Sequence, residues 1–144
     1  MNKEKAEEIK KHLSKYGWKF NFSEPNNFET GWSTQKERFK MVITASNSFA
    51  SFTVSIASLH NLSKTLELDI LKKLNDFNDR IYFVKACLTN NKEIILCCDL
   101  FNQRKINYNN FKLTLSLLTY YTHYFYKEIA ELLIKNKNTP YLIQ

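Results

Sequence analysis

Glycine and proline are scarce in this 144-residue sequence, which contains two residues of each. Two glycines cannot build a glycine-rich phosphate-binding loop or a dinucleotide-binding turn, and no GxSxG nucleophile motif is present. The three histidines, His12, His60 and His123, show no HxxxH, HxxE or HxD spacing, so no metal site is assembled locally. We therefore predict that the protein is not an enzyme, and we assign no catalytic, cofactor-binding or metal-binding residues.

Long hydrophobic runs and paired cysteines are also lacking. No apolar run approaches the roughly 20 residues that a membrane-spanning helix requires, and the charged N-terminal stretch does not resemble a signal peptide. Cys87, Cys97 and Cys98 form no CxxC pattern, and two adjacent cysteines in a strand point to opposite faces. These features predict a soluble cytoplasmic protein with reduced thiols and no membrane contact.

Acidic residues are outnumbered by basic ones: 14 Asp and Glu stand against 21 Lys and Arg, a net charge of +7. A basic protein can bind nucleic acid when its cations gather on one face. Here the excess is spread evenly, no run of Lys or Arg exceeds two, and arginine, the best base-reading residue, is rare. We therefore prefer a solvated lysine surface, and keep a basic regulator that contacts nucleic acid as the alternative function.

Apolar and aromatic residues are plentiful. Hydrophobic residues make up 44% of the sequence, and aromatic residues, with 11 Phe and 8 Tyr among them, make up 15%. This much apolar surface can offset the entropy of ordering the chain, so intrinsic disorder is excluded. The length suits one domain rather than two, and we predict a single domain over 1–144.

The first half of the sequence reads as one helix followed by strands. Apolar residues recur at helical spacing near the N-terminus, at Ala6, Ile9, Leu13 and Tyr16. Alternating patterns predict strands over 18–22, 39–45 and 52–56, and part of 32–37 is expected to pair in the same sheet. Pro25 and the pair Asn26–Asn27 predict a loop over 23–30.

The second half predicts a helix capped by Ser63 or Thr65, then a hairpin over 81–88 and 93–101. A long helix follows, with Asn107 as its N-cap and its end at about Asn136. The Asn90–Asn91 pair tolerates the positive φ that a tight hairpin turn needs. The run 94–98 is apolar on both faces, which predicts a strand that is central or covered on both sides. The order α-β-β-β-α-β-β-α predicts an α+β domain with helices packed on an antiparallel sheet.

Polar residues close the second predicted helix. We expect Asn75 and Asn78 to bond backbone groups where this helix turns into the next strand. Asp76 and Asp79, one helical turn apart, favour a solvated helix end over a pair of catalytic carboxylates. Whether Asn75 and Asn78 also have a functional role stays open.

The run Leu71-Lys72-Lys73-Leu74-Asn75-Asp76-Phe77-Asn78, followed by a hairpin and a long aromatic-rich helix, resembles the YbjN-like family. The resemblance covers the C-terminal half in detail and the N-terminal half by element order. The family is described as bacterial regulators and chaperone-like binding modules without an established catalytic site or cofactor. It is similar in fold to type III secretion chaperones, which are homodimers that hold an extended partner segment. The resemblance therefore implies a homodimeric, type III secretion chaperone-like protein that binds another protein.

The aromatic cluster at 120–126 is the most distinctive feature of the last helix. If one stripe of this helix faces the sheet, four other residues extend its apolar surface: Leu117, Tyr120, Tyr121 and Tyr124. Tyrosine is favoured at interfaces because its large rigid ring carries a polar tip. The alternative is that these rings pack over the sheet with their hydroxyls in water. We predict that the four residues bind a protein partner. The chain is then a non-catalytic chaperone-like or regulatory adaptor that binds a protein segment through the sheet and the aromatic helix, by burial of apolar side chains and edge-strand pairing.

Overall fold

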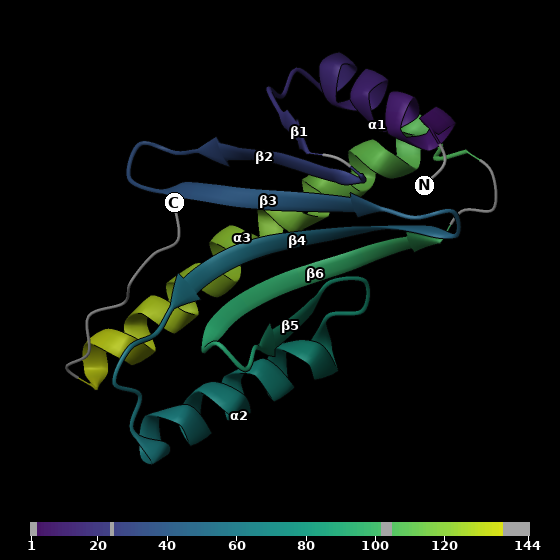
Figure 1. Cartoon of the computed structure of the whole chain (residues 1–144). Coiled ribbons are helices and arrows are strands. Elements are labelled where there is room, and N and C mark those ends of the chain that lie inside the picture. Colours follow the sequence, from purple (N-terminus) through teal and green to yellow (C-terminus); the bar gives the residue numbers. More distant parts are fainter. Residues whose placement is uncertain (1–2, 24, 102–104, 137–144) are drawn as a thin grey trace.

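The computed structural model describes residues 3–23, 25–101 and 105–136 and confirms the α+β class. Its elements are α1 (Lys3–Tyr16), β1 (Asn21–Ser23), β2 (Asn27–Ser33), β3 (Arg38–Ala45), β4 (Phe49–Ser58), α2 (Lys64–Arg80), β5 (Lys85–Leu88), β6 (Glu93–Phe101) and α3 (Tyr108–Lys135) (Figure 1). Four strands precede α2 where the sequence predicted three, so the predicted element order is wrong by one strand.

The strands form one antiparallel sheet in the order β1-β2-β3-β4-β6-β5. Helix α3 crosses behind β3 and β4 in the view of Figure 1, with α1 and α2 on either side of it. The sheet thus has one face covered by helices, and none of the described helices lies on the other face. We call these the helix face and the open face.

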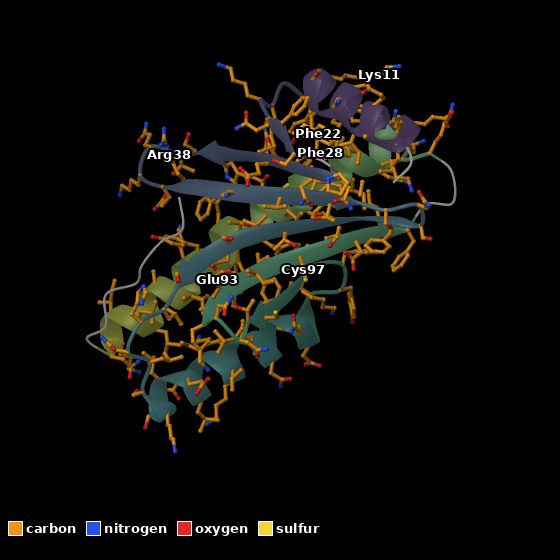
Figure 2. The ribbon with its side chains drawn as sticks, viewed as in Figure 1. Lys11, Phe22, Phe28, Arg38, Glu93 and Cys97 are labelled. Atoms are coloured by element: carbon orange, nitrogen blue, oxygen red, sulfur yellow. The ribbon has the colours of Figure 1, made fainter. Side chains whose placement is uncertain are left out.

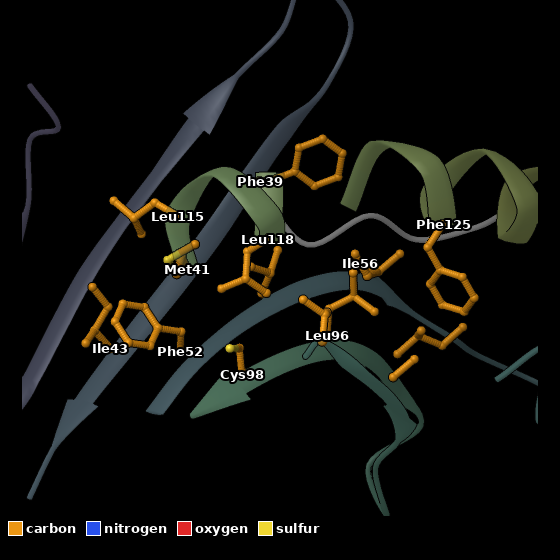
Figure 3. Packing of buried hydrophobic residues seen from close by; sticks show 14 of the residues in the cluster. Phe39, Met41, Ile43, Phe52, Ile56, Leu96, Cys98, Leu115, Leu118 and Phe125 are labelled. Carbon is orange, nitrogen blue, oxygen red and sulfur yellow. The ribbon is translucent and has the colours of Figure 1, made fainter. Parts of the chain in front are cut away.

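Alternation along the strands explains why one face is covered. In the register of β3 and β4, Met41 lies opposite Val54 and Ile43 opposite Phe52, and all four side chains are buried on the helix face. The side chains between them, such as Val42 and Thr53, are only half-buried and lie on the open face. Helix α3 closes the core with its buried stripe (Figure 3), which contains Phe111, Leu115, Leu118 and Phe125.

The predicted loop over 23–30 is wrong in its second half, because β2 begins at Asn27. Phe28 pairs with Ile43 across the β2–β3 ladder and is fully buried, and Phe22 packs against it at 4.9 Å between ring centroids (Figure 2). Asn26 does not break the sheet: its side chain donates to the carbonyl oxygen of Ala45 at 2.8 Å. The predicted strand over 18–22 is correspondingly shorter, since β1 covers Asn21–Ser23.

The predicted N-caps are confirmed, and of the two candidates for α2 the cap is Ser63 and not Thr65. The Ser63 hydroxyl accepts a hydrogen bond from the backbone N–H of Leu66 at 3.1 Å, and the Asn107 side chain accepts one from Asn109 at 2.7 Å. Gly17 follows α1 with φ +93°, a conformation that glycine adopts without strain. In the β5–β6 hairpin, however, the positive φ falls on Lys92 and not on the asparagine pair.

Strand β6 lies between β4 and β5, as its apolar sequence predicted, but it is not covered on both sides. Ile95 and Cys97 lie on its open face and are half-buried. Their partial burial comes from neighbouring strands, because no described helix packs there. The interior position of β6 in the sheet therefore accounts for its apolar character.

Candidate functional site

Helix α3 carries two apolar stripes that point in opposite directions. The inward stripe completes the core. The outward stripe is Leu113, Leu117, Tyr120 and Tyr124, at spacings of four, three and four residues, and we call it the outer stripe. No residue between Lys112 and Lys127 is charged, so the outer stripe runs along the helix without the charged side chains that normally face water.

The four predicted partner-binding residues divide into two pairs. Tyr120 and Tyr124 are exposed, with 65% and 37% of their surface accessible, whereas Leu117 and Tyr121 are half-buried against the core. Tyr121 packs edge-on against Phe77 of α2, with ring centroids 6.0 Å apart, and against Tyr120 at 5.0 Å. Leu117, Tyr120 and Tyr124 therefore share one surface, and Tyr121 lies at its border with the core.

A second segment borders the outer stripe: the end of α2 at Arg80 and the connector of residues 81–84, which leads from α2 to β5. Arg80 donates a hydrogen bond to the Tyr124 hydroxyl at 3.0 Å, and it pairs with Asp76 at 2.9 Å. The hydrogen bond to Tyr124 and the adjacent carboxylate of Asp76 raise the pKa of the Arg80 guanidinium, although its loss of hydration opposes this. Arg80 thus keeps its charge and holds the phenol of Tyr124 beside the connector.

Asn78 anchors the start of β5. Its side-chain amide donates to the carbonyl oxygen of Ala86 at 2.9 Å, and its carbonyl oxygen accepts from the Ala86 backbone N–H at 2.8 Å. The expectation that Asn78 bonds backbone groups is confirmed, whereas Asn75 is exposed and forms no described side-chain hydrogen bond. This two-bond clamp fixes the short edge strand β5, and with it the connector, relative to α2.

The connector places two large aromatic side chains in solvent: Tyr82 is 80% and Phe83 78% exposed. Phe83 lines an apolar cavity of about 180 Å³ between the connector, the end of β6 and the outer stripe, with Cys98, Leu100, Leu113 and Leu117 among its walls. We call this cavity the Phe83 pocket. Leu113, Phe83 and Leu100 were not among the predicted site residues, although Leu113 lies one helical turn before Leu117.

Two of the histidines, His12 and His123, serve the packing of the helices. His12 donates from Nε2 to the carbonyl oxygen of Ile106 at 2.6 Å and contacts the ring of Phe111. Nε2 of His123 accepts a hydrogen bond from the Trp32 indole at 3.2 Å. Within the described ranges, no three His, Cys, Asp or Glu residues gather where a metal ion could bind.

A basic cleft of about 630 Å³ lies near the opposite edge of the sheet from β5 and β6. It runs along β2, β3 and the segment before β1. Lys19, Arg38 and Lys40 bring three cations to its walls, and Glu29 pairs with Lys40 at 3.4 Å. Arg38 stands at the end of the sheet where β2 turns into β3 (Figure 2). This is a place where basic side chains gather, but one carboxylate already occupies part of it.

The described helices include none that combines the length and the apolar character needed to cross a membrane.

The fold and surface define a small α+β module whose last helix carries the uncharged outer stripe, with the Phe83 pocket beside it. The family model of YbjN, described as "Putative bacterial sensory transduction regulator", matches residues 5–131. The chain therefore belongs to the YbjN family, which confirms the family resemblance inferred from the sequence around Asn75 and Asn78.

A solved structure supports the same fold. The chain is similar to the crystal structure of E. coli YbjN, a protein described as a putative transcription regulator, with a TM-score of 0.63 and 15% sequence identity over 96% of both chains. At this identity the likeness concerns the fold alone. No curated protein matches the sequence. The resemblance to type III secretion chaperones stays a prediction.

Proposed function

We propose that this chain is a non-catalytic regulatory module that binds a segment of a partner protein on the outer stripe and the adjoining connector. The observation that supports this most directly is the exposure of Tyr120, Phe83 and Leu113 on one surface that lacks charge along four turns of α3. Interface centres are enriched in aromatic side chains and depleted in charge, and contiguous exposed apolar patches mark interaction sites. A regulatory role agrees with the family description.

The proposal is tested by site-specific photo-crosslinking in cells. The photoreactive amino acid p-benzoylphenylalanine replaces Tyr120, and in the control it replaces Leu68, which is 52% exposed on α2. We expect a crosslinked protein at position 120 that is absent at position 68. A crosslink between two copies of the chain at position 120 would identify the homodimer expected from the resemblance. Equal products at both positions, or none at position 120, would overturn the proposal.

A matched pair of variants measures how far binding depends on the stripe. Tyr120→Glu places a charge in the uncharged surface without touching the core, because Tyr120 is 65% exposed. The captured partner should be lost from Tyr120→Glu and kept by Leu68→Glu, while both variants keep the melting temperature of the wild type. If Tyr120→Glu kept the partner, the binding surface would not include the outer stripe, and the proposal would be wrong.

The basic cleft supports the alternative function, contact with nucleic acid. Lys19, Arg38 and Lys40 would contact phosphates, and such contacts weaken steeply as salt rises. We rank this function second, because the cleft also contains Glu29, paired with Lys40. Salt-dependent binding of a DNA or RNA duplex that falls in Arg38→Gln would favour the alternative, and no gel retardation at low salt would remove it.

A further inference from the structure

We infer that the partner segment binds as an added β-strand on the free edge of β6 and inserts one aromatic side chain into the Phe83 pocket. This inference rests on the proposed function and specifies the chemistry of the partner. Three features meet at the same place: an unpaired strand edge, an apolar pocket of defined size, and a carboxylate without an ion pair among the described residues.

The free edge arises because β5 is much shorter than β6. Strand β4 pairs with β6 along its whole length, as far as Phe49 opposite Phe101. On the other side, β5 pairs only from Leu88 opposite Ile94 to Lys85 opposite Cys97. The segment Cys98–Phe101 therefore has no described strand partner on its outer side. Unpaired backbone groups of an edge strand are a template for another extended chain, so the occupant must have an extended backbone.

The pocket lies on the helix face of this same edge. Because side chains alternate, Cys98 and Leu100 point toward the helix face, and both line the Phe83 pocket. An added strand would direct every second side chain into that space. The pocket measures about 180 Å³, and an apolar cavity of about 150 Å³ is known to hold benzene. One phenyl or phenol ring therefore suits the pocket, against Leu113 and Leu117.

The open face of the edge restricts the residues that flank this ring. Asp99 and Phe101 point there, Phe101 is 82% exposed, and Asp99 forms no ion pair with a described residue. Cross-strand neighbours of opposite charge, and pairs of aromatic with β-branched residues, stabilise a sheet. The segment should therefore carry Lys or Arg on one side of its aromatic residue and Val, Ile or Thr on the other.

The test uses two blocked peptides, Ser-Thr-Val-Phe-Lys-Thr-Ser and the version with Val and Lys exchanged, which cover both strand directions. Titration into the ¹⁵N-labelled full chain up to millimolar concentration should shift the amide signals of Cys98–Phe101 and of residues 113–117. Replacing the peptide Phe by Ala should weaken binding at least about tenfold, because the ring loses its pocket. Shifts confined to other regions, no shift, or equal affinity of the Ala peptide would overturn the inference.

Backbone pairing has its own signature. An added peptide strand would donate hydrogen bonds to β6 from every second amide, because the amides between them point away from β6. N-methyl groups on the first set of amides should therefore abolish binding, and those on the second set should not. Equal effects of the two sets would indicate a purely apolar contact and contradict strand addition. On the protein, Leu113→Glu should weaken peptide binding at least about tenfold and Leu68→Glu should not, since both residues are exposed and only Leu113 lines the pocket.

The two proposals fail separately. If position 120 crosslinks a partner but the peptides do not shift β6, protein binding stands and strand addition falls. Peptide-independent shifts of the β6 edge that grow with protein concentration would instead assign the edge to a second copy of the chain.

Discussion

The inward and outward stripes of α3 differ less in hydrophobicity than in the kind of side chain they use. Inward, Phe111 and Phe125 are fully buried, and their rings carry no polar atom. Outward, Tyr120 and Tyr124 present phenols, one of which accepts a hydrogen bond from Arg80. A ring with a hydroxyl keeps a hydrogen bond to water until a partner covers it, whereas the ring of phenylalanine has no polar atom to hydrate. The contrast holds along α3 and not at the connector and β6, where Phe83 and Phe101 are exposed. Along α3, the choice between phenylalanine and tyrosine, together with the helical period, distinguishes the core from the binding surface.

Removal of an inward ring should have the largest effect. Phe125 is fully buried and packs against Phe77 with ring centroids 4.8 Å apart. Phe125→Ala should lower the free energy of unfolding by about 3–5 kcal/mol, because it leaves a cavity in the core. Urea denaturation followed by circular dichroism measures this loss. A loss below about 1 kcal/mol would mean that α3 does not close the core as described.

The second-largest loss of stability should follow removal of the Asn78 clamp, which fixes β5 and the connector beside the outer stripe. Asn78→Ala removes two hydrogen bonds and leaves the N–H and carbonyl oxygen of the buried Ala86 without these partners. We expect a loss of about 2–3 kcal/mol. Asn75→Ala, on the exposed side of the same helix, is the control and should change stability by less than about 0.5 kcal/mol. Similar losses in the two variants would contradict the clamp.

Alkaline pH tests the burial of Cys98 beneath the Phe83 pocket. Burial raises the pKa of the Cys98 thiol from 9.0 to about 11, with smaller contributions from Asp99 and Cys97. The unfolded chain therefore loses this proton first as pH rises above 9, and the folded state is destabilised between pH 9 and 11 by about 2 kcal/mol from this group. Cys98→Ala should show a shallower fall of stability over that range. Identical slopes would argue against burial of the thiol.

A smaller effect of opposite sign is expected within the inward stripe. The Thr122 hydroxyl is fully buried and has no hydrogen-bond partner among the described residues, whereas Thr114 donates to the carbonyl oxygen of Asn110 at 2.8 Å. Thr122→Val should raise the free energy of unfolding by about 1 kcal/mol, because a desolvated polar atom is removed. Thr114→Val loses a real bond and should not stabilise the protein. Melting temperatures measured for the two variants and the wild type test this: only Thr122→Val should melt above the wild type.

The smallest effect on stability should come from the outward stripe. Tyr120→Ala should change the free energy of unfolding by less than about 0.5 kcal/mol, because Tyr120 is 65% exposed. Tyr121→Ala, at the border with Phe77, should cost more. Equal losses in the two variants would mean that Tyr120 is part of the core and would weaken its assignment to a binding surface.

Local patterns in the sequence predicted much of the fold. The alternation over 39–45 and 52–56, and the caps Ser63 and Asn107, each depend on neighbouring residues and are confirmed. The expected pairing of part of 32–37 is confirmed at Trp32 and Ser33, the last residues of β2. The start of β2 was missed because Pro25 and the asparagine pair are strong turn signals. The signal that could have revealed it is the pair Phe28 and Trp32, which lie four positions apart with the strand-forming Thr30 between them, so that both rings fall on the helix face.

The sequence predicted the part of the candidate site that lies on α3, and it did not predict the parts on the connector and β6. Helical spacing identified Leu117, Tyr120 and Tyr124, but it could not tell that Tyr121 packs on Phe77 of α2. The Phe83 pocket joins residues from α3, the connector and β6, and its existence depends on where the pairing of β5 with β6 ends. The point at which β5 stops pairing with β6 is set by tertiary contacts such as the Asn78 clamp. Such contacts leave no periodic pattern in the local sequence.

The position of α3 as the last described element bears on the biosynthesis of the chain. The central strand pair β4–β6 joins residues 35 to 52 positions apart, and the helix face of the sheet gains its main cover only from α3. At roughly 5–20 residues per second, Leu133 is synthesised roughly 4 to 15 s after Ser58. For that interval α1 is the only helix of the helix face that precedes the strands, and the part of the sheet that α3 covers is exposed. Apolar surface exposed in this way makes a nascent chain prone to aggregate, so the strands reach their stable state only when α3 has been made.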